Sequence, residues 1–236
     1  MIGESLVKCK KFDKPSYIGD PINTVRIFNE LEVDELCFLD VRATLENRKP
    51  NMDILRDIAS ECFMPLSYGG GIKDVDTALK ILSMGFEKIV LNTVIFDNPQ
   101  LVKDLAKHSG VQSVIGSIDV KKNLFGKYSI YSNNGRKKQE YDVIEWAKQL
   151  EQLGVGEILL SAMDKEATWL GFDDILVNNV SSQVSVPVIA NCGAGNVQHI
   201  QNALKAGASA VCLGSMVVYQ QKGMGVLINM PEINEQ

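Results

Sequence analysis

The sequence has no long apolar run and no leader-like start. Within its 236 residues no segment approaches the length of a membrane span. Residues 1–5 carry no basic region followed by an apolar stretch, so no secretory signal peptide is expected. We therefore expect a cytoplasmic protein that makes no contact with a membrane.

A basic excess is also missing. The formal net charge is −5, from 24 Lys and Arg against 29 Asp and Glu. Proteins that bind the nucleic-acid backbone usually present a basic face that displaces counterions. Nucleic acid is therefore not an expected partner, and any anionic ligand must be held by local groups.

Cysteine and histidine lack the spacing that metal sites need. The two histidines, His108 and His199, lie on helical stretches without ligand spacing. The cysteines are odd in number, scattered and mostly within apolar runs, which indicates reduced core residues. They are Cys9, Cys37, Cys62, Cys192 and Cys212. We predict that the protein carries no metal and no other cofactor.

No proline-, glycine- or serine-rich linker divides the chain. Its residues are 45% hydrophobic and 22% charged, which is enough to bury one large core. We expect residues 1–236 to form a single domain.

Short apolar segments alternate with amphipathic helical ones. Continuous apolar strands separated by helices are typical of a parallel sheet that is covered on its faces. The apolar segments fall at residues 36–39, 65–68, 88–91, 113–118, 157–160, 186–190 and 210–213, and two helical ones at 52–62 and 74–84. This order predicts an α/β fold, a (β/α)8 TIM-type barrel.

An ungapped internal repeat relates the two halves of the chain. Positions 65 and 187 are both proline, and 187 − 65 = 122. The same offset pairs Asp20 with Asp142, Ile22 with Ile144, Leu31 with Leu153, Glu35 with Glu157, Gly71 with Gly193, Leu82 with Leu204, Gly85 with Gly207 and Leu91 with Leu213. Such a repeat predicts two half-barrels. The partner of the strand at 113–119 would fall before position 1, so strand 1 is predicted to be missing from this chain.

Glycine-rich loops follow one strand in each half. The first contains Gly70 and Gly71, and the second contains Gly193 and Gly195. Glycines between a strand and a helix let backbone N–H groups approach a phosphate, although they also suit a tight turn.

Small polar residues stand at the end of the next strand in each half. They are Asn92 and Thr93 in the first half and Gly214 and Ser215 in the second. A glycine loop that faces such residues is a frequent phosphate site in barrels. The repeat thus predicts two phosphate sites on opposite sides of one mouth, which would fit a substrate with a phosphate at each end.

Acidic residues also follow the strands. Asp119 closes the strand at 113–118 and is predicted to act as a general acid or base between the phosphate sites, or else to cap a helix or pair with a neighbouring lysine. For four further residues two alternatives stand: they bind substrate hydroxyls, or they simply pair with Arg42 and Lys165. These residues are Asp40, Asp164, Glu166 and Thr168.

Three charged residues stand at the opposite ends of the strands. Glu35, Lys88 and Glu157 come just before apolar runs, and the two glutamates are repeat mates. Charges at the amino-terminal end of a barrel are costly unless they are paired. We expect either a charged ring or ordinary surface charge at this end.

Several motifs in this order resemble the cyclase subunit of imidazole glycerol phosphate synthase. They lie at residues 33–41, 68–72, 91–93, 117–119, 156–160 and 192–195, and the similarity extends from about residue 5 to about residue 217. The resemblance implies a heterodimer with a glutaminase, whose ammonia passes up the barrel. There it would split and cyclise a bis-phosphorylated ribulosyl nucleotide in histidine biosynthesis.

The resemblance also implies roles for single residues. Gly71 and Gly193 would bind phosphate, with Asn92, Thr93 and Ser215 nearby. Lys8 matches the lysine of a mobile first loop. The charged ammonia gate would be Glu35, Lys88 and Glu157. Of the family's two catalytic aspartates only Asp119 is present, because the other would fall before position 1.

Other features are similar to a paralogous branch that occurs in surface-polysaccharide clusters. They include residues 12–23, Glu166-Ala167-Thr168, Asn191-Cys192-Gly193 and an atypical tail from residue 218. In that branch the barrel and its glutaminase supply ammonia to a separate, ATP-dependent sugar amidotransferase. Two alternatives therefore stand: a cyclase and an ammonia conduit for lipopolysaccharide biosynthesis.

Overall fold

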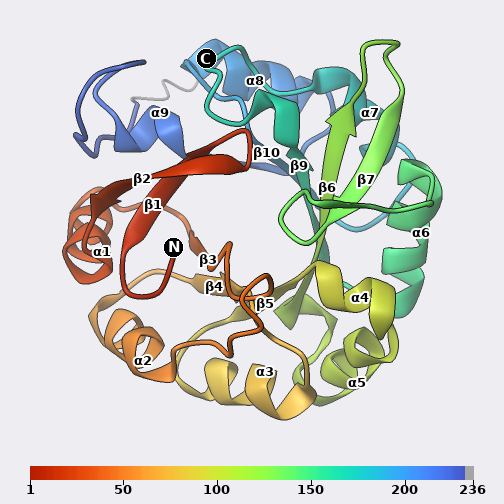
Figure 1. Ribbon diagram of the computed structural model, residues 1–236, viewed down its shortest axis with the longest axis horizontal. Coiled ribbons are helices and arrows are strands. Elements are labelled where there is room, and N and C mark those ends of the chain that lie inside the picture. The colour runs from red at the N-terminus through yellow and green to blue at the C-terminus, as the bar shows by residue number, and fades with distance from the viewer. Residues whose placement is uncertain (232–236) are drawn as a thin grey trace.

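The computed structural model describes residues 1–231. Seven parallel strands form its main sheet, in the spatial order β11-β10-β9-β6-β5-β4-β3. The strands are β3 (Leu36–Leu39), β4 (Leu66–Gly69), β5 (Lys88–Leu91), β6 (Val114–Lys122), β9 (Glu157–Ala162), β10 (Val188–Asn191) and β11 (Ala210–Cys212). Figure 1 shows helices as an outer ring around these strands. The predicted α/β barrel architecture is confirmed.

The helices follow the strands in the expected alternation. They are α1 (Pro21–Glu30), α2 (Met52–Glu61), α3 (Val75–Ser83), α4 (Thr93–Asp97), α5 (Gln100–Ser109), α6 (Val143–Leu153), α7 (Asp174–Ser181), α8 (Val197–Lys205) and α9 (Ser215–Val218), with 3₁₀ turns at Val111–Ser113 and Met163–Lys165. Their apolar faces bury residues such as Leu55, Ile81 and Trp146 against the sheet. None of the helices within residues 1–231 is long and apolar enough to cross a membrane.

The caps of the helices repeat at the offset of 122 that relates the two halves. Asp20 accepts a hydrogen bond from the Asn23 N–H at 2.9 Å, and Asp142 accepts one from the Ile144 N–H at 2.9 Å. Asp74 and Asn196 cap α3 and α8 in the same way. A side-chain cap satisfies a backbone donor that the helix leaves free. The agreement indicates that equivalent helices of the two half-barrels begin with the same kind of side-chain cap.

The parallel sheet of the described residues is open at its two outer strands. Within residues 1–231 the path of parallel strands ends at β3 and β11, and no eighth strand joins them. Met1 lies beside β3, where its carbonyl accepts from the Val41 N–H at 3.2 Å and its amino group donates to the Leu39 carbonyl.

Two antiparallel hairpins add to the barrel, and the sequence patterns did not predict either. β1 (Leu6–Lys10) pairs with β2 (Asp13–Gly19), and β6 pairs with β7 (Tyr128–Ser132), which continues to β8 (Lys137–Lys138). Because β6 extends to Lys122, Asp119 lies within a strand rather than at its end. In Figure 1 the β6–β7 hairpin extends beyond the ring of helices.

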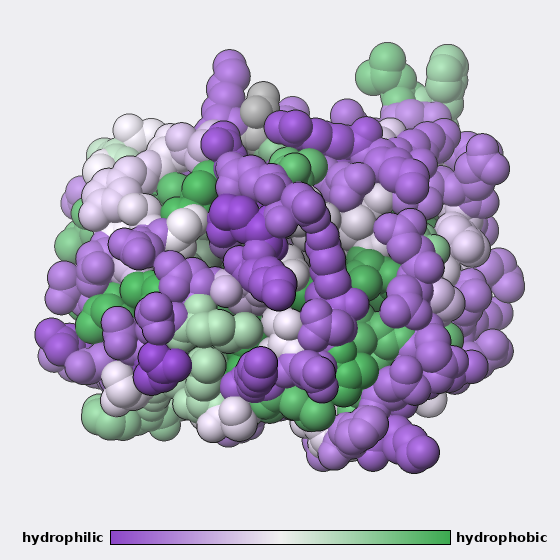
Figure 2. Space-filling view, turned by 60° about the horizontal axis from the view of Figure 1, so that its bottom comes forward, coloured by the Kyte–Doolittle hydropathy of each residue, from purple (hydrophilic) through white to green (hydrophobic). Residues whose placement is uncertain are grey.

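Apolar side chains fill the middle of the barrel. Val90, Ile115 and Leu159 form a buried cluster, against which Cys37, Leu39, Ile189 and Cys212 pack. Such a layer is typical of a barrel interior, which is a packed core rather than an open pore. On the outside, Figure 2 shows a face on which hydrophilic residues predominate, with smaller hydrophobic patches between them. The barrel thus has an apolar middle that separates polar groups at its two ends.

Candidate functional site

Polar residues form a row across the carboxyl ends of neighbouring strands. In the sheet register Asp119 of β6 lies beside Ser161 of β9, and Ser161 lies beside Asn191 of β10. The Asn191 side-chain amide donates to the Ser161 hydroxyl at 3.0 Å. Side chains at one level of adjacent parallel strands point to the same face. The register therefore gathers these three residues at the mouth of the barrel.

Asp119 supplies the carboxyl group of this row. Only 8% of the surface of Asp119 is exposed to solvent. Burial raises the pKa of Asp119 to about 7, against the opposing effect of hydrogen bonds with Ser161 and Asn92. A carboxyl group with such a pKa can both donate and accept a proton near neutral pH, which is what acid–base catalysis requires.

The other strand-end acids are engaged elsewhere. Asp40 pairs with Arg48 at 3.2 Å and also accepts from the backbone N–H groups of Arg42 and Ala43. The expectation that the Arg42 side chain pairs with Asp40 is therefore wrong, because the loop after β3 folds back and places Arg48 there. Asp164 accepts from the Lys122 N–H at 3.2 Å.

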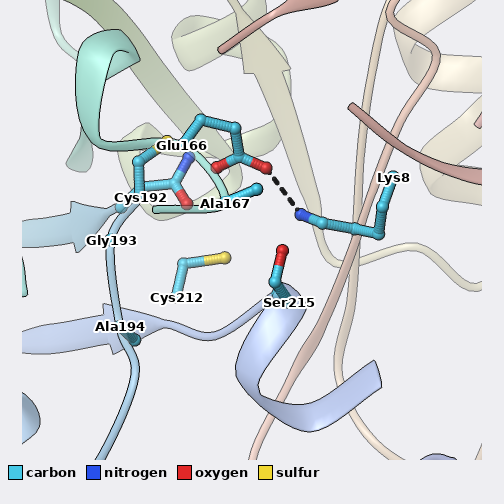
Figure 3. Close-up of a pocket in the computed structure, with 10 residues that line it drawn as sticks. Lys8, Glu166, Ala167, Cys192, Gly193, Ala194, Cys212 and Ser215 are labelled. Carbon is cyan, nitrogen blue, oxygen red and sulfur yellow. Dashed lines mark hydrogen bonds and ion pairs between the residues drawn. The ribbon is translucent and has the colours of Figure 1, made fainter. Parts of the chain in front are cut away.

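The second glycine loop lines a small pocket at the mouth (Figure 3). Five of the predicted residues meet there: Lys8, Glu166, Gly193, Gly214 and Ser215, together with Ala167, Asn191, Cys192, Ala194 and Cys212. Lys8 Nζ lies 2.8 Å from Glu166 Oε1, so the partner of Glu166 is Lys8 rather than Lys165. Burial lowers the pKa of Lys8, but the charge and hydrogen bond of Glu166, together with nearby Cys192 and Cys212, raise it, and the net direction is upward. The long first hairpin thus brings a cation to the second half-barrel.

Two predicted members of this site lie outside the pocket lining. The Thr168 hydroxyl donates to the Lys165 carbonyl at 2.7 Å. The Gly195 N–H donates to His199 Nδ1 at 3.1 Å. Both groups are therefore engaged in holding the loop after β9 and the start of α8 in this structure.

The first glycine loop lies on the other side of the mouth. Gly70 has φ +119, and a Cβ at this position would come within 2.4 Å of the Asp40 carbonyl oxygen. The Asn133 N–H donates to the Thr93 hydroxyl at 3.0 Å, so the loop after β7 closes over this side. Asn92 and its repeat mate Gly214 share a backbone conformation, with φ/ψ of −132°/−89° and −125°/−92°. The repeat therefore preserves the backbone conformation at this one position of the two predicted phosphate sites.

Three charged residues meet at the opposite end of the barrel. Lys88 Nζ lies 2.8 Å from Glu35 Oε2 and 2.9 Å from Glu157 Oε1. Burial lowers the pKa of Lys88, but the two glutamates raise it, with a net upward direction. A cleft beside this cluster is lined by Leu82, Phe86, Glu87, Ser109, Gln112 and Ser113. One ammonium group therefore bridges two carboxylates at the base of the barrel.

Comparison with known proteins shows to which family this chain is related. The family described as "Histidine biosynthesis protein" matches residues 3–223. A protein of Thermococcus onnurineus named imidazole glycerol phosphate synthase subunit HisF is 41% identical over 215 residues, which cover 91% of this chain and 84% of that protein. The chain belongs to the HisF family.

Other HisF relatives cover similar lengths. A protein of Pseudomonas aeruginosa with a provisional name, imidazole glycerol phosphate synthase subunit hisF2, is 46% identical over 231 residues, or 98% of this chain and 92% of that protein. A provisionally named subunit hisF3 of Vibrio vulnificus is 43% identical over 238 residues, which cover 99% of this chain and 90% of that protein.

Some residues of this HisF-family site were missed in the sequence. Ser161 follows the alternation of β9 two residues after Leu159, so its inward direction could have been inferred from the strand period. Arg48 gave no such signal, because its contact with Asp40 depends on the path of a loop. Cys212 stood out only as a buried cysteine.

Proposed function

We propose that this HisF-type chain is the cyclase subunit of an imidazole glycerol phosphate synthase. In this proposal it receives ammonia from a HisH-type glutaminase at the base of the barrel and uses it at the mouth. The substrate is a bis-phosphorylated ribulosyl nucleotide, which is split and cyclised. Asp119 is the acid–base group that moves protons during these steps.

The environment of Asp119 is the observation that carries this proposal. Its carboxyl group is buried and has a pKa of about 7. It also stands in a row of hydrogen-bonding side chains between the two glycine loops. Ring closure with ammonia needs protons to be removed from nitrogen and supplied to oxygen, and a group that titrates near neutral pH does both.

Binding of a substrate with two phosphates is supported by the duplicated loops. Gly71 with Asn92 and Thr93 would hold one phosphate, and Gly193 with Gly214 and Ser215 the other. Backbone N–H groups and hydroxyls are suitable donors for phosphate oxygens. Lys8 adds the positive charge on the second side.

Docking of a glutaminase at the base of the barrel is supported by the charged cluster there. Glu35, Lys88 and Glu157 stand below the apolar layer of Val90 and Ile115. Ammonia is small and uncharged, so an apolar layer admits it more readily than it admits ammonium or other ions. A change in the pairing of Lys88 would let ammonia enter this layer.

The test is turnover of the ribulosyl substrate with an ammonium salt as nitrogen source. The native chain should form imidazole glycerol phosphate and aminoimidazole carboxamide ribotide. Asp119→Asn should lower kcat by a factor of about 100 or more, the range typical of a lost acid–base group. Its phosphate binding should remain. Absence of product from the folded native chain would refute the cyclase assignment.

A second candidate is favoured by the state of the other mouth acids. Asp40 and Glu166 are engaged by Arg48 and Lys8, so neither of these two acids is free to act beside Asp119. In this alternative the chain conducts ammonia to a separate sugar amidotransferase of lipopolysaccharide biosynthesis and performs no cyclisation. Its signature is stimulation of the glutaminase by this chain in the absence of product from the ribulosyl substrate.

A further inference from the structure

The second glycine loop lies beside a close, largely buried ion pair. Lys8 Nζ and Glu166 Oε1 lie 2.8 Å apart, with side chains that are only 20% and 13% exposed. The repeat offset relates Glu166 to position 44, because 166 − 122 = 44, and position 44 is a threonine. The first half therefore has no acid at the equivalent position, and the buried acid beside its own glycine loop, Asp40, comes instead from the end of β3 and pairs with Arg48.

The carboxylate of Glu166 already occupies the ammonium group of Lys8, which an anionic ligand would need as a donor. It accepts from Lys8 Nζ at 2.8 Å, and the Cys192 thiol is near enough for the carboxylate to raise its pKa. Figure 3 shows Lys8 and Glu166 joined across the pocket, with Ser215 on the adjacent side. In effect the pocket already contains one negative charge, supplied by the protein.

Ser215 gives independent evidence that the pocket receives a ligand. Its hydroxyl oxygen is buried, lines the pocket and has no hydrogen-bond partner among residues 1–231. A buried hydroxyl without a partner has given up its hydrogen bonds to water and gained none in return. Such a group is well placed to donate to a ligand oxygen that enters beside Lys8.

We propose that Glu166 determines the charge preference of this pocket by competing with the ligand anion for Lys8. A dianionic phosphate that reaches Ser215 and Gly193 meets the carboxylate of Glu166 as well as the ammonium group of Lys8, and repulsion between these like charges, or displacement of Glu166 from Lys8, weakens its binding. The native pocket therefore binds phosphate weakly compared with a pocket in which position 166 is neutral. This inference rests on the proposed phosphate-binding role of the second glycine loop.

Titration of the full chain with inorganic phosphate tests the inference. Calorimetry at constant ionic strength compares the native chain with Glu166→Gln, which removes the charge and keeps the shape. Released from Glu166, Lys8 can make one charged hydrogen bond to phosphate, so the affinity should rise by about 10- to 100-fold. Glu166→Ala should change the affinity in the same direction, which covers the case in which the glutamine variant fails to fold.

Two matched variants locate the effect. Glu61→Gln removes an acid from an exposed pair with Arg26 at 3.0 Å on the outer helices, and should leave phosphate affinity unchanged. Ser215→Ala added to Glu166→Gln should remove most of the gain, because it removes a second donor of the same pocket.

Two results would overturn the inference. One is unchanged or weaker phosphate binding in both Glu166 variants while thermal melting shows them folded. The other is a gain that persists in full after Ser215→Ala, which would place the bound phosphate elsewhere. Neither result affects product formation from ammonium by the native chain, so failure of this inference is distinguishable from failure of the proposed function.

Discussion

Asp119→Asn should stabilise the protein in a way that depends on pH. Burial raises the pKa of Asp119 from an ordinary value of 3.8 to about 7. Between these values the native protein keeps a proton that the unfolded chain has lost. The stability contributed by this proton is fully present below pH 3.8 and is lost as the pH rises through 7. The difference of about 3 pKa units corresponds to about 4 kcal/mol at most.

Asparagine does not titrate, so it avoids this loss. The free energy of unfolding of Asp119→Asn minus that of the native chain should therefore rise with pH, by up to about 1.4 kcal/mol per unit between pH 5 and 7. Above pH 7 the difference should level off. Urea unfolding of both proteins at pH 5, 6, 7 and 8 measures it directly.

A suitable control is Asp53→Asn, because the Asp53 side chain is 90% exposed. Its effect should stay within about 0.5 kcal/mol and should not vary over the same pH range. A constant difference between Asp119→Asn and the native chain from pH 5 to 8 would refute the argument, because it would mean that Asp119 titrates alike in the folded and unfolded states.

Three further tests by urea unfolding address other parts of the structure. Lys88→Met leaves two partly buried carboxylates without their shared cation and should cost about 1–3 kcal/mol; no loss would mean that the three charges act independently. Asp20→Ala and Asp142→Ala remove equivalent helix caps and should each cost about 1 kcal/mol, whereas unequal losses would argue against equivalent half-barrels. Gly71→Ala brings Cβ to 2.6 Å from a backbone carbonyl oxygen, while Gly3→Ala at a similar positive φ meets nothing within 4 Å. The first should therefore cost at least about 1 kcal/mol more than the second, and equal costs would show that backbone conformation alone demands glycine.

The sequence was sufficient for those features that depend on local patterns. Strand and helix alternation predicted the parallel sheet, and the offset of 122 predicted that Asp20 and Asp142 would be equivalent, as their caps confirm. A cap, a turn and a strand each depend on neighbours only a few residues away. Their signals survive in a single sequence for that reason.

Contacts between distant segments could not be predicted in this way. Lys8 and Glu166 are separated by 158 positions, and their pairing depends on how the β1–β2 hairpin lies over the mouth. The β6–β7 hairpin was also missed, because its strand β7 is only five residues long and its polar and apolar residues do not alternate regularly. The residues of the site were largely identifiable, but their partners required the fold.

Ammonia transfer through the barrel is the central claim, and it is tested most directly by comparing two nitrogen sources in Lys88→Met. With a HisH-type glutaminase present, product formation is measured first with glutamine and then with an ammonium salt. The variant should lose most of its glutamine-dependent turnover and retain its ammonium-dependent turnover, because free ammonia reaches Asp119 from the mouth. Equal loss with both sources, or no loss with either, would contradict a path that begins at Lys88.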